Sequence, residues 1–216
     1  MLYKYLPSQF AVNFVERGEV LFRSLSYFRK IEHAARGDEI EGVHMDAPDH
    51  DVSLEVPRLG KTFVGRYRAL NSIDQERVYA FCCSRSYSNE LKKEFGCDCC
   101  VLIRDPKTFF LRCRTAARRH ATVEPPGLLH RDVAYYAPNS ESPLPITDPH
   151  SLPFLKHRDF AAQDEYRAVF ATIGGFKITR RIVQPAFTFE EEIMQATSFE
   201  RLLRLGPLKG VAEVLA

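Results

Sequence analysis

Short runs of apolar residues alternate with polar ones along most of the chain, and their periods predict several strands and a few helices. "LYKYL" predicts a strand, residues 8–17 predict a helix with Phe10 and Phe14 at helical spacing and Gly18 as its stop, and "EVLFR" predicts a second strand. We expect Ser8 to cap this helix through its hydroxyl group. The order of these elements, followed mainly by strands, predicts the α+β class.

The middle of the chain carries the strongest strand pattern. "RVYAFCCS" is apolar on both faces, which is typical of a central strand, and "CDCCVLIR" predicts a further strand. Between them, Ser88 is placed to cap a short helix in which Leu91 and Phe95 stack one turn apart. Asp105 and Pro106 are the residue types expected at the N-cap and first position of another helix.

The last third of the chain predicts a hairpin and a final helix. "EYRAVFATI" and "FKITRRIV" flank Gly174 and Gly175, and two glycines supply the positive φ of a tight hairpin turn. We therefore expect these two strands to pair with each other. "SFERLLRLG" predicts a short amphipathic helix with Ser198 as its cap.

Length and proline placement favour a single domain over residues 1–216. A chain of 216 residues is long enough for one sizeable core. Seven of the 13 prolines lie in residues 124–153, around the strand-like "RDVAYY". We expect this segment to be a surface excursion and not a linker, because neither flank has the elements of a complete fold.

Composition and charge narrow the class of protein without pointing to an activity. A content of 45% hydrophobic and 27% charged residues is ordinary for a folded, soluble protein. A formal net charge of +2 is too small to imply nucleic-acid or membrane binding over the whole molecule. No apolar run approaches the ~20 residues of a membrane span, and the N-terminus lacks a secretory pattern, so we expect a cytoplasmic protein.

The cysteines are expected to be reduced. Cys82 with Cys83, and Cys99 with Cys100, form adjacent doublets inside apolar runs, unlike the spaced cysteines of a disulfide framework. Cys97 and Cys100 have the spacing of a zinc-binding pair, but the sequence holds no second pair of this kind. We therefore favour buried thiols and assign no metal site.

One predicted strand opens with polar residues that need an explanation. In "FAAQDEYRAVF", residues 160–170, an extended backbone would put Gln163, Glu165 and Arg167 on one face. A carboxylate near the interior of a sheet is costly unless it is paired or used. Glu165 either pairs with Arg167 or another basic side chain at the rim, or stabilises positive charge on a ribose in a nucleotide pocket.

Three separated pieces of the chain, within residues 2–183, carry a resemblance to a known family. They are "LYKYLPSQFAVNFVERGEVLFRS", with Lys4, Tyr5 and Arg23 at strand ends, "YAFCCSRS", with Ser84 and Ser86, and Gln163-x-Glu165. Together they are similar to a divergent ADP-ribosyltransferase fold, that of the DarT-like toxins and related bacterial proteins. The chain departs from that pattern: it has no clear histidine on the first strand, and Lys4 stands where one branch has arginine, unless Arg23 takes its place.

The resemblance implies a mixed or antiparallel split sheet and an enzyme that uses NAD as a substrate. Breaking the bond between nicotinamide and ribose develops an oxocarbenium-like cation, which a fixed carboxylate stabilises. Glu165 would have this role, and Gln163 would orient the acceptor or the ribose hydroxyls. The acceptor would be protein, nucleic acid or water, and the implied setting is a toxin or a phage-defence effector.

The same resemblance implies binding roles for residues outside the catalytic strand. Arg23 or Lys4 would bind the pyrophosphate of NAD, a task for which a guanidinium is the better suited group. Ser84 and Ser86 would support the nicotinamide site. The rings of Tyr5 and Tyr79 would stack on nicotinamide or adenine, although tyrosine on an apolar strand also packs in cores.

A run of charges, "RKIEHAARGDEIEG", has two interpretations. It contains Arg29, Glu32, His33, Arg36, Asp38, Glu39 and Glu41. Such a run forms a solvated helix face with internal ion pairs, or a lid that orders over the pocket when a ligand binds. A further hypothesis is a hydrolase in which Asp38, Glu39 or Glu41 forms a carboxylate pair with Glu165.

A basic stretch supports an alternative function. It contains Arg104, Lys107, Arg112, Arg114, Arg118 and Arg119, together with His120. These residues form either a solvated helix edge or a phosphate-binding surface for RNA or DNA. The alternative is a non-catalytic nucleotide- or nucleic-acid-binding module on the same fold, whose binding would not depend on the carboxylate of Glu165.

Overall fold

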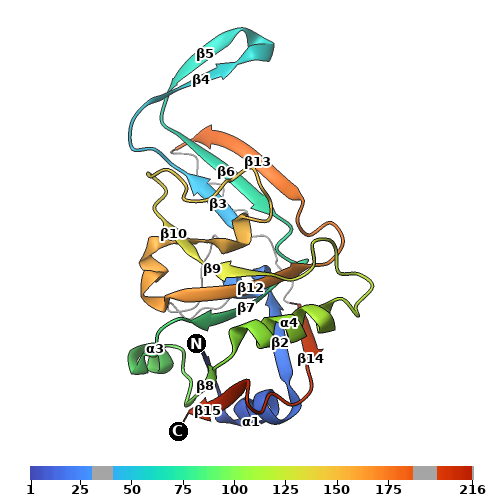
Figure 1. Cartoon of the computed structure of the whole chain (residues 1–216). Coiled ribbons are helices and arrows are strands. Elements are labelled where there is room, and N and C mark those ends of the chain that lie inside the picture. The colour runs from blue at the N-terminus through green and yellow to red at the C-terminus, as the bar shows by residue number, and fades with distance from the viewer. Residues whose placement is uncertain (31–40, 187–198, 216) are drawn as a thin grey trace.

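The computed structural model describes residues 1–30, 41–186 and 199–215 of the chain. Within these residues an eight-stranded antiparallel sheet forms the centre of the molecule (Figure 1). Its main path, in spatial order, is β14 (Glu200–Arg204), β2 (Glu19–Ser24), β7 (Val78–Ser84), β1 (Leu2–Leu6), β8 (Cys99–Ile103) and β15 (Ala212–Leu215). On the other edge of β7 lie β12 (Glu165–Ala171) and then β9 (Leu129–Asp132).

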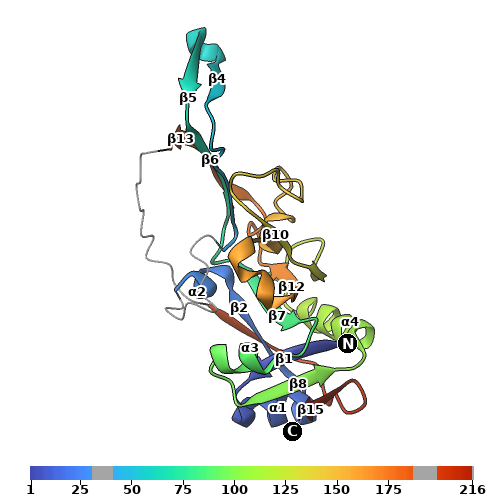
Figure 2. The ribbon, with the colours of Figure 1, turned by 90° about the vertical axis from the view of Figure 1, so that its left-hand side faces the viewer.

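Three smaller sheets extend from this centre. One has the order β13 (Ile178–Pro185), β6 (Tyr67–Ile73) and β3 (Val43–Asp46). A parallel pair joins β10 (Ala134–Tyr136) to β11 (Leu155–His157), and β4 (Val52–Val56) with β5 (Lys61–Gly65) forms a hairpin. This hairpin projects beyond the rest of the molecule (Figures 1 and 2).

Helices are few and short beside the strands, and this mixture of elements confirms the predicted α+β class. The α-helices are α1 (Ser8–Arg17), α2 (Leu25–Lys30), α3 (Asn89–Glu94) and α4 (Pro106–Ala117), and the 3-10 helices are η1 (Pro57–Leu59), η2 (Leu152–Phe154) and η3 (Arg158–Gln163). The predicted caps of α3 and α4 are confirmed: the side chain of Ser88 accepts from the backbone N–H of Leu91, and that of Asp105 from Thr108. No helix of the described residues is long and apolar enough to cross a membrane.

The central sheet is buried on both faces. On one face Phe81 of β7 packs with Phe14 of α1 and Phe109 of α4, and all three rings are almost completely buried. On the other face Ala80 packs in a second cluster with Phe154. Burying such an aromatic side chain contributes about 1.5–3 kcal/mol, so these clusters hold the helices and loops against the sheet.

The proline-rich segment 124–153 contributes to this core as well as to the surface. Its strand β9 pairs with β12 inside the central sheet, and Leu128 and Leu152 are buried. The main-chain carbonyl of Pro153 also accepts a hydrogen bond from Arg167.

The central sheet opens between β1 and β2. Both strands lie on the same edge of β7, but Tyr3 pairs with Ser84 at one end while Arg23 pairs with Ala80 nearer the other. Away from these contacts β1 pairs with β8, and β2 pairs with β14. The two strands therefore diverge from β7 and from each other. α1 connects the end of β1 to the start of β2 (Figure 2). We call the space bounded by β1, β2, β7 and α1 the wedge.

Two predicted elements near the end of the chain are wrong. β12 and β13 do not form a hairpin, although Gly174 has a φ of +86° in a turn between them. A strand has two edges, and those of β12 are occupied by β7 and β9, so β13 pairs with β6 instead. "SFERLLRLG" forms the strand β14, because pairing with β2 along its whole length satisfies its backbone. Its proposed cap, Ser198, lies outside the described residues.

The predicted cap of α1 is also wrong. The N-cap position is occupied by Pro7, and Ser8 is the first helical residue. Instead, the backbone N–H and hydroxyl of Ser8 donate to the carboxylate of Asp98, at 2.7 and 2.8 Å. A side chain distant in sequence therefore satisfies this helix end, which a local pattern could not indicate. The end of α1 at Gly18, with a φ of +65°, is as predicted.

Candidate functional site

The wedge holds a cavity of about 600 Å³. β1 and β2 form its sides, β7 its narrow end and α1 its wide end, while α2 adds Tyr27 and Phe28. Beyond β7, the cavity reaches the start of β12. Six of the predicted site residues line it: Lys4, Tyr5, Arg23, Ser84, Gln163 and Glu165.

The other two predicted site residues, Tyr79 and Ser86, do not line the cavity. Residues of β7 alternate between the two faces of the sheet, so Tyr79 lies on the opposite face from Ser84, in the core beside Phe170. Ser86 follows the end of β7, and its hydroxyl donates to Asp164 at 2.9 Å. The structure thus places Tyr79 in the core and gives Ser86 a role in the loop after β7.

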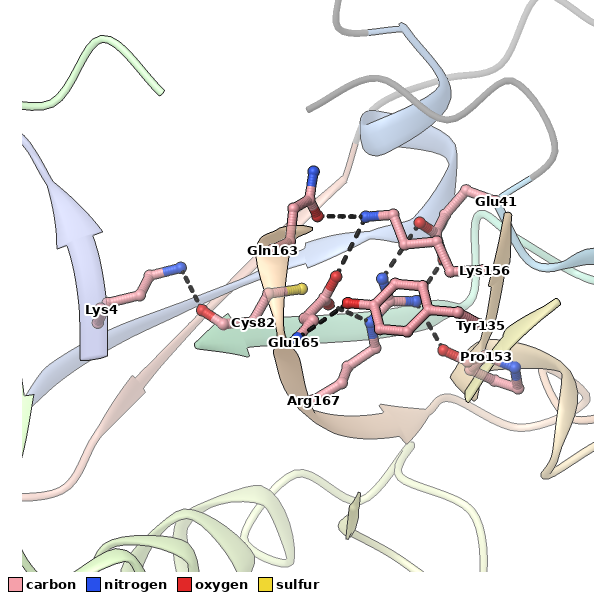
Figure 3. Close-up of polar contacts among 9 residues, drawn as sticks. All are labelled: Lys4, Glu41, Cys82, Tyr135, Pro153, Lys156, Gln163, Glu165 and Arg167. Carbon is pink, nitrogen blue, oxygen red and sulfur yellow. Dashed lines mark hydrogen bonds and ion pairs between the residues drawn. The ribbon is translucent and has the colours of Figure 1, made fainter. Parts of the chain in front are cut away.

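Glu165 is buried, and both of its carboxylate oxygens are bound. Oε1 accepts from Nε of Arg167 at 2.6 Å, and Oε2 accepts from the ammonium of Lys156 at 3.1 Å. Its backbone N–H donates to the hydroxyl of Tyr135 at 2.9 Å (Figure 3). The side chain is thus held from several directions. The pairing with Arg167 that one interpretation of the sequence expected is confirmed, but the carboxylate is buried and not at the rim.

These contacts belong to a longer chain of buried charges. Beyond Arg167, a two-point ion pair connects its guanidinium to Glu41, and both of these side chains are completely buried. At the other end, Lys156 also donates to Oε1 of Gln163 at 2.8 Å. The order Glu41, Arg167, Glu165, Lys156 alternates in sign (Figure 3) and sums to zero, which lowers the cost of burying four charged groups.

The neighbours of Glu165 set its protonation state. Burial alone would raise the pKa of this carboxyl group, but the positive charges of Arg167 and Lys156 outweigh burial and hold the pKa well below its usual range. Burial raises the pKa of the neighbouring Cys82 thiol to about 12. Glu165 is therefore ionised at any physiological pH, and Cys82 is neutral.

Gln163 reaches the site by a different backbone path from the one predicted. It ends η3 rather than lying on the strand, and Asp164 then adopts a left-handed conformation with φ 43°. The strand begins only at Glu165. Gln163 and Glu165 nevertheless meet, because both bind Lys156. The predicted shared face of Glu165 and Arg167 is confirmed.

Lys4 provides a positive charge on the other side of β7. Its ammonium donates to the carbonyl of Cys82 at 2.8 Å, on the edge where β1 and β2 have diverged from β7 (Figure 3). It also lies 4.7 Å from the centre of the Phe81 ring. Within the part of the chain that the structure describes, no ion pair joins Lys4 to a carboxylate. Its charge is thus available to an anion in the cavity.

Arg23 and Tyr5 also face the cavity but have partners of their own. Nη1 of Arg23 binds Glu200 at 2.6 Å, and the guanidinium lies 4.1 Å from the centre of the Tyr27 ring. The hydroxyl of Tyr5 accepts from the N–H of Ser88 at 2.7 Å, which positions the loop between β7 and α3. Lys4 is therefore better placed than Arg23 to bind an incoming phosphate group.

No family model, no curated protein and no solved structure matches this chain.

The charge run before β3 is only partly described. Glu32, His33, Arg36, Asp38 and Glu39 lie outside the described residues. Glu41, which the sequence places in the same run, is completely buried in its pair with Arg167. For this residue both the solvated-face and the lid interpretations are wrong. Its carboxylate meets Glu165 only through Arg167.

The basic stretch begins just before α4 and runs along it to its end. The buried side of this helix packs Phe109 and Phe110 in the core. The charged residues Arg104, Lys107, Arg118 and Arg119 are exposed. Arg104 pairs with Glu213, and a guanidinium N–H of Arg112 donates to the carbonyl of Pro207. None of the predicted cations of this stretch lines the cavity. It is thus a basic surface separate from the cavity.

None of the six cysteines forms a disulfide. Cys97 and Cys100 pack with Tyr5 and Leu91 in a small apolar cluster. Among residues 1–30, 41–186 and 199–215, no group of three or more His, Cys, Asp or Glu side chains is arranged to hold a metal ion.

Sequence reasoning missed two residues that hold Glu165. Lys156 follows the apolar run "LPFL", but lysine is mostly exposed unless it is paired, so this position alone does not predict a buried cation. Tyr135 lies in "RDVAYY", where nothing separates a tyrosine of the core from one that binds the backbone of Glu165. Both reach the site through the parallel pairing of β10 with β11.

Proposed function

We propose that this protein is an ADP-ribosyltransferase-like enzyme that uses NAD and breaks the bond between nicotinamide and its ribose. The observation that most supports this is the convergence of Glu165, Gln163, Ser84 and Arg23 on one cavity that also holds Lys4. On this proposal the fold is a divergent ADP-ribosyltransferase fold, and the wedge between β1 and β2 is the opening of its split sheet.

The chemistry rests on Glu165. Departure of nicotinamide leaves positive charge on the ribose, and a carboxylate that is already ionised and fixed stabilises this charge without reorganising. Its low pKa suits this role and does not suit a general acid, which needs a raised pKa. This argues against the hydrolase hypothesis with a carboxylate pair. A carboxylate has roughly four lone-pair positions, so its present partners leave capacity for a ribose hydroxyl.

The rest of the cavity suits the other parts of NAD. Its volume of about 600 Å³ lies within the range of about 300–1,000 Å³ that is typical of small-molecule sites. The ammonium of Lys4 would bind the pyrophosphate as a point charge. Tyr3 and Tyr27 line the cavity and offer ring faces to the planar ends of the dinucleotide. Gln163, held by Lys156, would orient a ribose hydroxyl or the acceptor.

The test is nicotinamide release from NAD by the purified protein and by Glu165→Gln. We expect release by the wild type and a loss of about 100-fold or more in the variant, or about 2.7 kcal/mol of transition-state stabilisation. Glu213→Gln is the matched control, because it also removes an ion-paired carboxylate but lies outside the cavity. It should leave the rate unchanged.

A second variant covers the case in which Glu165→Gln does not fold. Lys4→Met keeps the apolar stem and removes the charge, so it should raise KM for NAD more than it lowers kcat. Absence of nicotinamide release from the wild type, with and without cell lysate as a source of acceptor, would refute the enzymatic proposal. It would favour a non-catalytic module that binds nucleotides or nucleic acid.

A further inference from the structure

The cavity carries a charged residue that the proposed function does not use. Glu19 begins β2 at the wide end of the wedge and lines the cavity. Along β2, Val20 and Phe22 are completely buried in the core, whereas Glu19, Leu21 and Arg23 line the cavity. Alternation along the strand thus places the Glu19 carboxylate on the cavity side.

Glu19 lies far from Glu165 along the wedge. Arg23 pairs with Ala80 near the narrow end, and Glu19 is four residues earlier on the same strand. At about 3.3 Å per residue, β2 covers about 13 Å between the two positions. The ammonium of Lys4 lies at the edge of β7, between the start of β12 and the wide end. From one end to the other, the site therefore presents negative, positive and negative groups.

The surroundings of Glu19 leave its carboxylate open to a ligand. No ion pair joins Glu19 to a cation within residues 1–30, 41–186 and 199–215. Arg204 is the cross-strand partner of Glu19 on β14, but it does not line the cavity. Leu21, two residues further along β2, and its cross-strand partner Leu202 on β14 are apolar residues that also line the cavity.

We infer that Glu19 binds the adenosine ribose of NAD and makes the site select NAD over NADP. This inference rests on the proposed function. A dinucleotide presents a ribose that becomes cationic, then a pyrophosphate, then a second ribose, in the same order as Glu165, Lys4 and Glu19. Ribose hydroxyls donate hydrogen bonds to a carboxylate, as in other dinucleotide sites, whereas a 2′-phosphate is repelled by it.

The apolar residues around Glu19 complete this assignment. Phe10 is 54% exposed and Leu202 is 44% exposed, although both line the cavity. A purine ring packed against this apolar surface would cover it, while its ribose would lie beside the carboxylate. The wide end thus fits adenosine, and the narrow end fits the reacting ribose.

The test compares two pairs of ligands in the wild type and in Glu19→Gln. Nicotinamide release is measured with NAD and NADP, and calorimetric binding is measured with ADP-ribose and its 2′-phosphate, which need no turnover. In the wild type we expect the 2′-phosphorylated ligand to be at least about 10-fold poorer in both assays, from like-charge repulsion. Glu19→Gln should reduce this ratio by about 10-fold. Arg204→Gln, outside the cavity, should not reduce it.

Each outcome decides a separate point. Equal use of NAD and NADP by the wild type, or a ratio unchanged in Glu19→Gln, would overturn the role of Glu19 and leave the proposed function intact. A preference for NADP that is lost in Arg204→Gln would also overturn it. If neither nicotinamide release nor ADP-ribose binding occurs, the proposed function fails and this inference fails with it.

Discussion

The alternating charges around Glu165 predict a specific pattern of non-additive stability. Glu41 and Arg167 are completely buried, and Lys156 and Glu165 are 4–5% exposed, so an unbalanced charge among them is poorly screened by solvent. Glu41→Gln leaves a buried net charge of one positive unit, and Lys156→Met leaves one negative unit. The double variant retains only the pair of Glu165 with Arg167, which is neutral again.

The magnitude follows from the cost of breaking a buried pair. Removing one partner typically costs 3–5 kcal/mol, so the two single variants should together lose about 6–10 kcal/mol of unfolding free energy. The double variant should lose about 1–3 kcal/mol less than this sum, because it removes charges of opposite sign that share Arg167 and Glu165 as neighbours.

Urea unfolding at pH 7, followed by circular dichroism, measures all three variants against the wild type. The exposed pair of Arg85 with Asp132, at 2.5 Å, provides a matched control. Asp132→Asn should cost less than about 1 kcal/mol and should add to the effect of Glu41→Gln. A coupling energy below about 0.5 kcal/mol between Glu41→Gln and Lys156→Met would refute the charge-balance argument.

Three further predictions concern acid stability, a buried histidine and a helix cap. The pKa of Glu165 is depressed in the folded state, so the stability that its carboxylate contributes is complete above the unfolded pKa of about 4.3 and declines as the pH falls below that value. An acid titration should therefore show a shallower loss of unfolding free energy in Glu165→Gln than in the wild type. His44 is buried, and neither ring nitrogen has a hydrogen-bond partner among the described residues. His44→Phe keeps the stacking on Tyr136, so thermal unfolding should show a gain of about 1 kcal/mol at pH 7. The gain should grow as pH falls below about 6.5, because burial lowers the pKa of His44 and the unfolded state takes up the proton first; a constant gain would contradict this. Ser88→Ala removes the cap of α3 and should cost about 1 kcal/mol in urea unfolding, whereas Ser140→Ala, in an exposed turn, serves as comparison.

Much of the local structure could be predicted from the sequence, because its causes are local. The 3.6-residue spacing in α1, the apolar run of β7 and the capping residues of α3 and α4 all act within a few positions of the chain. The same holds for the shared face of Glu165 and Arg167, which follows from the two-residue period of a strand.

Only the tertiary structure decided which edges and charges meet. The glycine turn after β12 predicts a hairpin, but β7 and β9 already occupy both edges of that strand. The pattern of β14 is compatible with a helix or a strand, and the free edge of β2 selects the strand. In each case the competing partner is distant in sequence, so no local pattern reports it.

For the candidate site as well, the sequence indicated some residues, and only the structure showed their partners. The residue types at Glu165, Gln163 and Lys4 drew attention to a carboxylate, an amide and a cation, and each of them lines one cavity. The partners that fix the carboxylate could not be predicted, since Glu41 is 126 residues from Arg167 and Tyr135 is 30 residues from Glu165. Sequence alone determined which groups need a partner when they are buried. The order of strands in the sheet determined which partner each group received, because hydrogen bonds and ion pairs depend on distances in space that a linear pattern does not contain.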